Sequence, residues 1–400
     1  MFEPFVLKPL GELADLRMGG TPSRAEPDFW DRDNAGHPWV SIGDLRGEYI
    51  SRTKESVTKL GARAARLSAV PPGVPIMSFK LSMGRAAIPT VPVYTNEAIV
   101  ALFPKSGISF AKWLYYSVPR VVQSAVTETA VKGQTLNLKK LRELLIPTPY
   151  TLEEQRRIAE ILDSVDEYIA TASAILDKRE KVRIGIISDL INSYGSQGMV
   201  RLRDVGSIGS GSTPSRGRSD YWVNGTIPWV KTAEVAFSVI TDTAEHVTAS
   251  AVRDCRLSVY PAGTVLVAMY GEGATRGRSA ILGVPATVNQ ACAAITCDTK
   301  TLSPEYLFEC LKHLYGEIRL LGHGSNQTNL NAEMLGELEV PAPSLEEQEK
   351  LTAVMRDFDR ESFVLAETLS KARAIKQGLA EDLLTGRVRV PEAEAVVESL

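Results

Sequence analysis

The sequence predicts an α+β protein with two pseudo-repeated, mixed α/β domains held apart by two long antiparallel coiled-coil helices, related by a pseudo-two-fold axis. Two observations carry this prediction. Short motifs occur twice, and the offset between the copies stays between 190 and 193 residues. Each copy is followed by a long stretch without proline in which apolar residues recur every 3.5 residues, the period of a coiled coil. Such a long offset indicates tandem duplication of a whole domain with its linker rather than a solenoid.

The repeated motifs divide the chain into segments. The matched motifs are Thr21-Pro22-Ser23-Arg24 with Thr213-Pro214-Ser215-Arg216, Pro38-Trp39-Val40 with Pro228-Trp229-Val230, Asn96-Glu97-Ala98 with Asn289-Gln290-Ala291, and Leu152-Glu153-Glu154-Gln155 with Leu345-Glu346-Glu347-Gln348. We therefore expect domain 1 at residues 1–150, long helix 1 at 151–192, domain 2 at 193–343, long helix 2 at 344–385, and a tail at 386–400. The tail is expected to pack near the N-terminus, where it is a candidate edge strand.

Each domain mixes strand and helix signals. Residues 74–79 and 264–269 follow turn sequences and are predicted strands, while 111–117 and 304–313 are predicted helices. Four of the five tryptophans recur in pairs, and all five are predicted to pack in the core. The order of elements along the chain leaves the sheet topology open.

Both long helices have a clear start and an apolar seam. Thr151 with Glu154, and Ser344 with Glu347, form the capping-box pattern that satisfies free amides at a helix N-terminus. Alternate steps of four and three from Ile158 and from Leu351 give ten positions in each helix, of which eight are apolar. Two equal seams in one chain can pack together, and the order of segments requires an antiparallel pair. At about 1.5 Å per residue, each helix spans about 60 Å.

Charge is unevenly distributed. The whole chain carries 45 Lys and Arg against 48 Asp and Glu, a net charge of −3, which does not indicate nucleic-acid binding. Residues 1–150 nevertheless hold 19 against 13, a net charge of +6, whereas residues 199–343 hold 12 against 14, a net charge of −2. The first domain is therefore basic and the second is not.

Cysteine usage and hydropathy indicate the cellular environment of the protein. The four cysteines include no Cys-x-x-Cys pair, and with four scattered histidines they give no zinc-site spacing. Buried, reduced thiols fit a cytoplasmic protein. We expect no signal peptide and no membrane span, because the sequence lacks a basic start and an apolar run of 18 residues.

A two-fold scaffold that fixes the separation of two related domains is suited to reading paired half-sites on DNA. The paired Thr-Pro-Ser-Arg and Pro-Trp-Val segments, the two Leu-Glu-Glu-Gln helix starts and the Leu383-Leu384-Thr385-Gly386 end resemble the specificity (S, or HsdS) subunits of type I restriction–modification systems. The resemblance extends over nearly the whole chain.

The resemblance implies a non-catalytic subunit with two target recognition domains. Each would read one half of a bipartite double-stranded DNA target, and the helices would set the spacer. Two modification (M) subunits, which hold S-adenosylmethionine and methylate adenine, and restriction (R) subunits that cleave DNA would be its partners. The chain itself would hold no cofactor and no metal, and no membrane would be involved.

Two other functions are compatible with the sequence. The same module serves type IIB- or IIG-like restriction–methylation enzymes, and a coiled-coil adaptor without DNA binding would have similar helices. The chain lacks the Asn/Asp-Pro-Pro-aromatic loop of amino-methyltransferases, and its glycine-rich segment at residues 271–279 lacks the spacing and lysine of a P-loop. We therefore expect no catalysis by this chain alone.

Candidate DNA-binding residues lie in polar, glycine-containing segments that repeat between the domains. Arg and Lys bind phosphate or guanine, and Asn and Gln bind adenine. Each segment has a structural alternative: a solvated hairpin tip, a structural turn, or a loop that caps the domain. The candidates are Arg24, Lys80, Ser82, Arg85, Lys132 and Gln134 in the first domain, and Arg216, Arg218, Tyr270, Thr275, Arg276, Arg278, Asn326 and Gln327 in the second.

Overall fold

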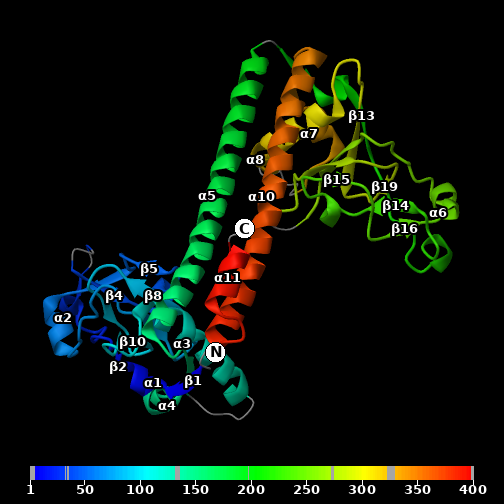
Figure 1. The fold of residues 1–400 in the computed structure, drawn as a ribbon. Helices are drawn as coiled ribbons and strands as arrows, with labels where there is room; N and C mark the ends of the chain where they lie inside the picture. The colour runs from blue at the N-terminus through cyan, green and yellow to red at the C-terminus, as the bar shows by residue number, and fades with distance from the viewer. Residues whose placement is uncertain are drawn as a thin grey trace. The chain divides into compact units, whose positions relative to one another are not determined.

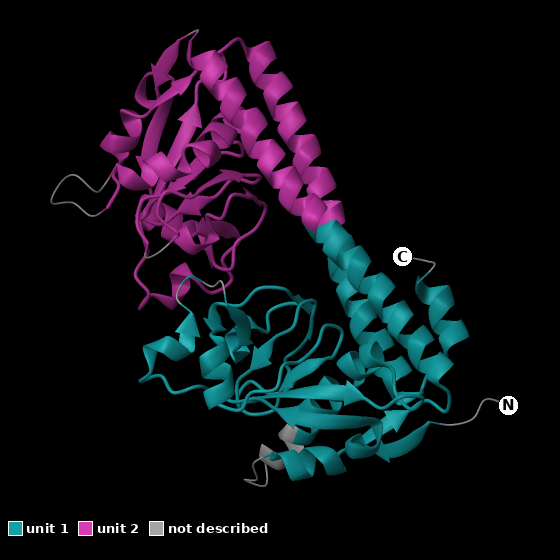
Figure 2. Cartoon of the chain, turned by 90° about the vertical axis from the view of Figure 1, so that its left-hand side faces the viewer, with its two compact units in different colours: residues 1–173, 368–400 teal, residues 174–367 magenta. Residues whose placement is uncertain are grey.

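A computed structural model describes residues 5–31, 33, 36–130, 136–196, 198–271, 274–321 and 329–397. The chain forms two compact units (Figure 2): unit 1 comprises residues 1–173 and 368–400, and unit 2 comprises residues 174–367. The boundary crosses both long helices. Each unit therefore contains one α/β domain and one portion of each helix.

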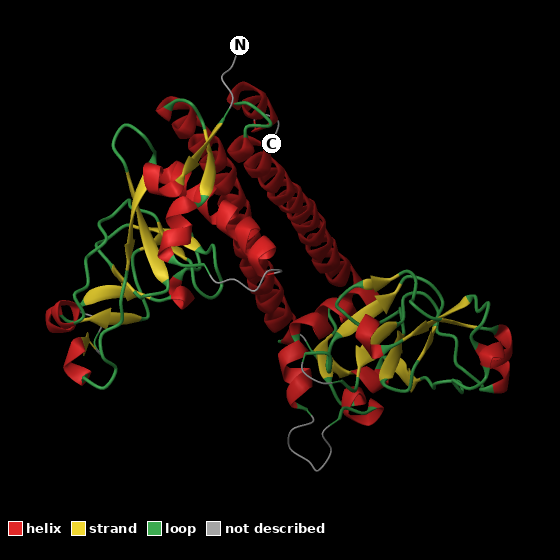
Figure 3. Ribbon diagram, turned by 90° about the horizontal axis from the view of Figure 1, so that it is seen from below, coloured by secondary structure: helices red, strands yellow, loops and turns green. Residues whose placement is uncertain are grey.

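The domain of unit 1 is built on a five-stranded sheet of order β2-β10-β7-β8-β5. Figure 3 draws the strands of both domains in yellow. Neighbouring strands are antiparallel except β5 and β8, which are parallel. A four-stranded sheet, β3-β6-β4-β9, and a two-stranded ladder, β1-β11, complete the domain. The strands are β1 (Val6–Pro9), β2 (Ala14–Met18), β3 (Trp30–Asp31), β4 (His37–Val40), β5 (Tyr49–Ile50), β6 (Glu55–Val57), β7 (Ile76–Ser78), β8 (Ala86–Pro89), β9 (Tyr94–Thr95), β10 (Ile99–Pro104) and β11 (Leu145–Thr148).

Unit 2 repeats this topology, except that its smaller sheet has three strands instead of four. Its five-stranded sheet has the order β13-β20-β17-β18-β15, with a three-stranded sheet, β16-β14-β19, and a β12-β21 ladder. The register also agrees, because Ile76 lies opposite Ala101 in unit 1 and Leu266 lies opposite Ala294 in unit 2. The strands are β12 (Met199–Arg201), β13 (Gly206–Ser210), β14 (Ile227–Val230), β15 (Val239–Ile240), β16 (His246–Val247), β17 (Val265–Ala268), β18 (Ser279–Leu282), β19 (Thr287–Val288), β20 (Cys292–Cys297) and β21 (Glu339–Pro341).

Short helices flank both sheets. The helix predicted at 304–313 is α7, whose Ser303 side chain accepts a hydrogen bond from the Tyr306 amide. The helix predicted at 111–117 runs on to Ala130 through Pro119, because the fully buried Val118 and Val122 continue its apolar face. The domain helices are α1 (Leu10–Leu13), α2 (Lys59–Ala64), α3 (Ala111–Ala130), α4 (Leu138–Glu143), α6 (Ala249–Asp254), α7 (Pro304–His313), α8 (Tyr315–Leu320) and α9 (Ala332–Gly336).

The two long helices are α5 (Leu152–Gly195) and α10 (Leu345–Thr385), drawn in green and orange in Figure 1. In unit 1 the start of α5 packs against the end of α10, and in unit 2 the end of α5 packs against the start of α10. The pair is therefore antiparallel. Every seam position predicted from the 3.5-residue period is buried or half-buried.

The glutamine of each Leu-Glu-Glu-Gln motif fixes the helix to its own domain. The Gln155 side chain accepts from the Phe110 amide at 2.9 Å and donates to the Ile108 carbonyl at 3.0 Å. Gln348 does the same with Ser303 and Thr301, at 2.8 and 2.9 Å. Because buried amides need such partners, the repeated glutamine attaches each long helix in the same orientation in both units.

The tail is helical, so the edge strand considered for its first residues is wrong. Gly386, with φ of +76°, ends α10, and α11 (Val390–Val397) follows. A proline in the first turn and alternating Glu and Ala favour this helix. Arg389 binds Glu154 at 2.6 Å and lies 5.6 Å from the centroid of the Phe5 ring. The tail thus covers the start of α5 beside the N-terminal strand.

Candidate nucleic-acid interface

The Thr-Pro-Ser-Arg turn of unit 1 is fixed to the smaller sheet by its arginine. The guanidinium of Arg24 lies 3.7 Å from the ring centroid of Trp30, and its Nη2 donates to Glu55 Oε2 at 3.0 Å. Trp30 meets Trp39 edge to face, with centroids 5.0 Å apart. The hydrogen bond with Arg24 holds the pKa of Glu55 below its usual value.

Unit 2 repeats this arrangement with equivalent residues. Arg216 lies 3.9 Å from the Trp222 centroid and donates to Glu245 at 3.2 Å. Trp222 meets Trp229 edge to face at 5.1 Å. Hydrogen bonds from Arg216 and then Lys231 lower the pKa of Glu245 to about 2. Not all five tryptophans are core residues, contrary to the prediction from the sequence. Trp39, Trp113 and Trp229 are buried, whereas Trp30 and Trp222 are half-buried under these arginines.

These contacts bear on three candidate residues. Arg24 and Arg216 each have a carboxylate partner and an aromatic platform, which favours a structural role for the turn over a phosphate contact. Arg218 is likewise occupied, since its guanidinium donates to both oxygens of Asp220 at 2.8 and 2.7 Å. That hydrogen-bonded ion pair raises the pKa of Arg218.

The β7–β8 hairpin carries Lys80, Ser82 and Arg85 at an exposed tip. The buried Ser78 hydroxyl shapes the tip, because it donates to the Ser82 carbonyl at 2.8 Å and accepts from the Arg85 amide at 3.1 Å. Gly84 has φ of +79° and leaves no space for a Cβ against α3. The backbone of the loop is therefore fixed by Ser78 and by packing of Gly84 on α3, while its charged side chains are exposed to solvent.

The β17–β18 hairpin is the corresponding element of unit 2. Tyr270 is exposed, whereas Thr275, Arg276 and Arg278 are half-buried. Arg276 donates to the Arg319 carbonyl of α8 at 3.1 Å, so this side chain is turned toward its own domain. The Nε atom of Arg278 is buried with no hydrogen-bond partner within the described part of the chain.

Hydrogen bonds define which residues correspond in the two hairpins. Gly84 donates to the Ser78 carbonyl, and Gly277 donates to the Ala268 carbonyl. The amides of Ser78 and Ala268 in turn donate to the carbonyls of Arg85 and Arg278, which makes these two arginines equivalent. Since 78 and 268 differ by 190 and 85 and 278 by 193, unit 2 carries three extra residues in this hairpin.

The structure brings the turn and the hairpin of unit 1 together around Glu97. Thr21 donates a hydrogen bond to the Glu97 carboxylate, and this bond lowers its pKa. The positive charges of Lys80 and Arg24 lower it further. Sequence reasoning noted Glu97 only as part of a repeated motif, because its neighbours lie far away along the chain.

Unit 2 replaces this charged group by a neutral one. Thr213 donates to the side-chain oxygen of Gln290 at 2.6 Å, where unit 1 has a carboxylate. Tyr270 takes the place of Lys80. The same backbone frame thus presents a carboxylate in one domain and a neutral amide in the other.

Four candidates lie outside the described residues: Lys132, Gln134, Asn326 and Gln327.

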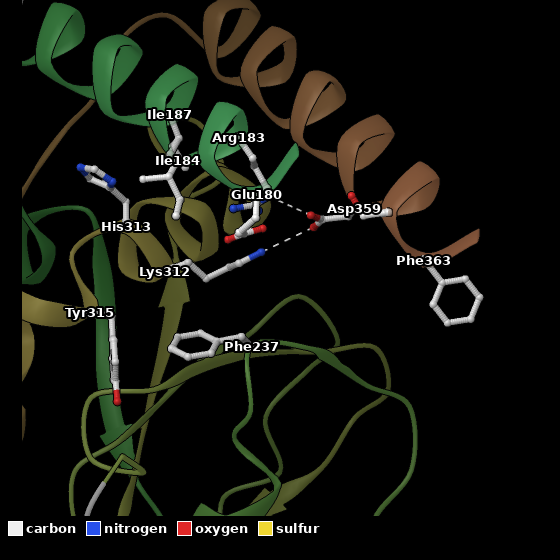
Figure 4. A pocket seen from close by; sticks show the side chains of 11 residues that line it. Glu180, Arg183, Ile184, Ile187, Phe237, Lys312, His313, Tyr315, Asp359 and Phe363 are labelled. Carbon is white, nitrogen blue, oxygen red and sulfur yellow. Dashed lines mark hydrogen bonds and ion pairs between the residues drawn. The ribbon is translucent and has the colours of Figure 1, made fainter. Parts of the chain in front are cut away.

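A polar cluster interrupts the helix seam in unit 2. Arg183 of α5 donates to Glu309 of α7 at 2.6 Å and to Asp359 of α10 at 2.8 Å. Lys312 lies 3.1 Å from Glu309 and 3.5 Å from Asp359. Figure 4 shows the contact with Asp359. The cluster forms one wall of a 570 Å³ pocket that Phe237 and other residues complete. In unit 1 the equivalent seam contact is the ion pair of Lys376 with Asp166.

All four cysteines are free, and burial raises the pKa of Cys292, Cys297 and Cys310 to about 12. Within the described residues, every helix is too short or too polar to span a bilayer. The same residues contain no group of three or more His, Cys, Asp or Glu side chains placed to hold a metal ion.

Comparison with known families identifies the repeated unit. The model for the type I restriction modification DNA specificity domain matches residues 3–180 and again residues 196–372. The chain belongs to this family. Each match covers one of the two repeated α/β domains together with much of the long helix that follows it.

Members of the specificity family resemble the chain over most of its length. The type I restriction enzyme MjaIX specificity subunit of Methanocaldococcus jannaschii is 23% identical, covering 96% of this chain and 93% of that protein. The EcoR124I/EcoR124II specificity subunit of Escherichia coli is 24% identical, covering 66% of this chain and 67% of that protein.

Solved structures share the fold. The type I restriction–modification S subunit of M. genitalium has a TM-score of 0.58 at 15% identity and matches over 96% of both chains. A chain solved in work on complex assembly and conformational transition of the type I R-M system has a TM-score of 0.64 at 16% identity, covering 97% of this chain and 100% of that one. The specificity-family fold predicted from the sequence is therefore confirmed.

Proposed function

We propose that this chain is the non-catalytic DNA sequence-specificity subunit of a type I restriction–modification complex. Each recognition domain reads one half of a bipartite target, and α5 and α10 dock two M subunits and set the spacer. The M subunits supply S-adenosylmethionine and methylate adenine, and R subunits join them for cleavage. The observation that carries this proposal is that one frame, repeated in both units, presents different side chains at equivalent loops.

The hairpin tips are the best candidates for base reading. Lys80 and Arg85 are exposed cations, and Arg is the commonest partner of the guanine O6/N7 edge. Tyr270 and the three added residues give unit 2 a longer tip with a smaller net positive charge. Residues 270–278 carry a net charge of +1 against +2 for residues 80–85, which is a small part of the difference in charge between the two domains.

An exchange of hairpin tips tests the proposal. Residues 80–83 are replaced by residues 270–276, and the full chain is expressed with its candidate M subunit in a host whose methylated sites are then sequenced. The half-site read by unit 1 should change while the other half and the spacer stay the same. The matched control is Pro72→Ala, which gives the turn at the opposite end of β7 the sequence found in unit 2.

Two outcomes would contradict the proposal. Unchanged methylation after the exchange would remove the hairpin from base reading. A chain that recovers a partner but never binds duplex DNA would instead be a coiled-coil adaptor.

The spacer function has its own test. One heptad inserted into both α5 and α10 near the boundary between the units preserves the apolar seam and lengthens the pair by about 10 Å. The methylated sites should keep both half-site sequences and gain spacer length. Altered half-sites with an unchanged spacer would show that the helices do not set the separation.

A further inference from the structure

Unit 1 contains a cavity of 240 Å³ beside the Gly19-Gly20 turn. Arg17 from the end of β2 and Arg66 from the segment after α2 line it, and Phe103 of β10 contributes an aromatic wall. The guanidinium of Arg17 lies 4.3 Å from the Phe103 ring centroid. Neither arginine has an ion-pair partner among the residues that the structure describes. The cavity therefore combines a flat apolar wall with two cations whose charge is not neutralised by a carboxylate.

The equivalent space in unit 2 is filled by a tyrosine. Val70 pairs with Val93, and at the same place in unit 2 Tyr260 pairs with Ala286, so Val70 and Tyr260 are equivalent. The Tyr260 hydroxyl donates to the Ser210 carbonyl at 3.0 Å. One unit thus closes this space with its own aromatic ring, while the other leaves it open.

The residues around this space change together. Gly209 stands where unit 1 has Arg17, and a Cβ added to Gly209 would lie 2.4 Å from the Tyr260 hydroxyl. A side chain at 209 therefore requires the tyrosine to move from its observed position. Unit 1 has the reverse combination, in which a small Val70 accompanies Arg17. Both positions differ between the units in a matched way, which argues that the open cavity is more than a packing defect.

We propose that this cavity binds one nucleotide, with its base in the space that Tyr260 fills in unit 2 and its phosphate at Arg17 and Arg66. The tyrosine shows that a planar ring fits this fold. Bases stack on aromatic and guanidinium planes, and arginine binds phosphate through paired donors. The cavity is smaller than the roughly 300 Å³ at which pockets for drug-sized ligands begin, so it suits a single small group.

The nucleotide has two possible sources with the same chemistry: a free nucleoside monophosphate, or a nucleotide of the bound DNA. The second source rests on the proposed function, whereas the first does not. Either source requires the open space and the two arginines. The test therefore uses variants that remove these features separately.

The first arm is isothermal titration of the full chain with each deoxynucleoside 5′-monophosphate and with inorganic phosphate. Val70→Tyr fills the cavity as unit 2 does, and an Arg17→Ala/Arg66→Ala variant removes the cations. Tyr260→Val is the matched control, because it opens the space in unit 2 without supplying an arginine at 209. For a free nucleotide, we expect binding at least tenfold tighter than for phosphate, lost at least tenfold in both unit 1 variants and unchanged in the control.

The second arm measures duplex binding by the complex of the chain with its M subunits. If the nucleotide belongs to DNA, free nucleotides give no heat, and Val70→Tyr weakens target binding at least tenfold relative to Tyr260→Val. Thermal unfolding checks each variant, and the arginine variant carries the test if Val70→Tyr fails to fold. Nucleotide binding that survives Val70→Tyr, or no response in either arm, overturns the proposal. Intact binding of wild-type complex to its target would then leave the proposed function standing.

Discussion

Replacing Arg183 with Met should destabilise unit 2 far more than the same change at Lys376 destabilises unit 1. The Arg183 side chain is only 9% exposed, and that of its partner Glu309 is 7% exposed. Burial by itself would lower the pKa of Arg183, but attraction by Glu309 and Asp359 outweighs it and raises the pKa. Arg183→Met therefore removes a cation that is held charged and leaves a buried carboxylate behind.

The expected loss in the free energy of unfolding depends on which partners Glu309 keeps. Breaking one partner of a buried ion pair costs about 3–5 kcal/mol. Lys312 stays 3.1 Å from Glu309, so we expect the lower end, about 3 kcal/mol. Lys376 and Asp166 are 31% and 24% exposed, and a pair with such access to solvent is worth up to about 1 kcal/mol.

Hydrogen exchange followed by peptide mass spectrometry reports the opening free energy of each unit separately, which a single melting curve of a two-unit chain does not. Adding Glu309→Met to Arg183→Met should restore most of the loss, because apolar replacement of a buried pair is close to neutral. Equal effects of Arg183→Met and Lys376→Met, or no recovery in the double variant, would refute this reasoning.

Three further predictions concern single residues. Arg85→Gln should weaken DNA binding by the complex and reduce its salt slope by about 1, whereas Arg24→Gln should lower thermal stability and leave the slope unchanged; titrations at several salt concentrations separate the two. Glu245 has a pKa of about 2 through its bond with Arg216, so its stabilising effect is complete above about pH 4.5 and is lost as pH falls toward 2. Glu245→Gln should be less stable at pH 7 and lose less stability between pH 5 and 2 in urea titrations; an unaltered acid profile would contradict this. Gln348→Ala should cost about 1–3 kcal/mol by leaving buried backbone groups without partners, measured as faster exchange of the peptides around residue 303.

Much of the architecture could be predicted because its signals are local. The capping residues Thr151 and Ser344 accept the amides of Glu154 and Glu347, as their spacing requires. The apolar seam needs only a 3.5-residue period, and the duplication needs only the recurrence of motifs. The tail was mispredicted as a strand because Val388 and Val390 suggest β-structure, whereas the Glu-Ala residues that follow form a helix.

The candidate site was only partly accessible from the sequence. The hairpin tips were identified by their glycines and cations, which are local features. The partners of Arg24 and Arg216 were not, since Glu55 and Glu245 lie about 30 residues away and reach them through sheet pairing. Composition therefore suggested phosphate contacts for two arginines whose charge is already satisfied within the domain.

The sequence by itself determined that the protein is a duplicated α/β domain joined by two paired helices, because periodicity, capping and repetition are properties of neighbouring residues. Only the tertiary structure decided which residues of the two units correspond and how their surroundings differ. It brought the charge of Lys80 close enough to lower the pKa of Glu97, made Arg85 the counterpart of Arg278, and left open in unit 1 the space that Tyr260 fills in unit 2. These relations depend on strand register and on distances between residues far apart along the chain, which no local pattern encodes.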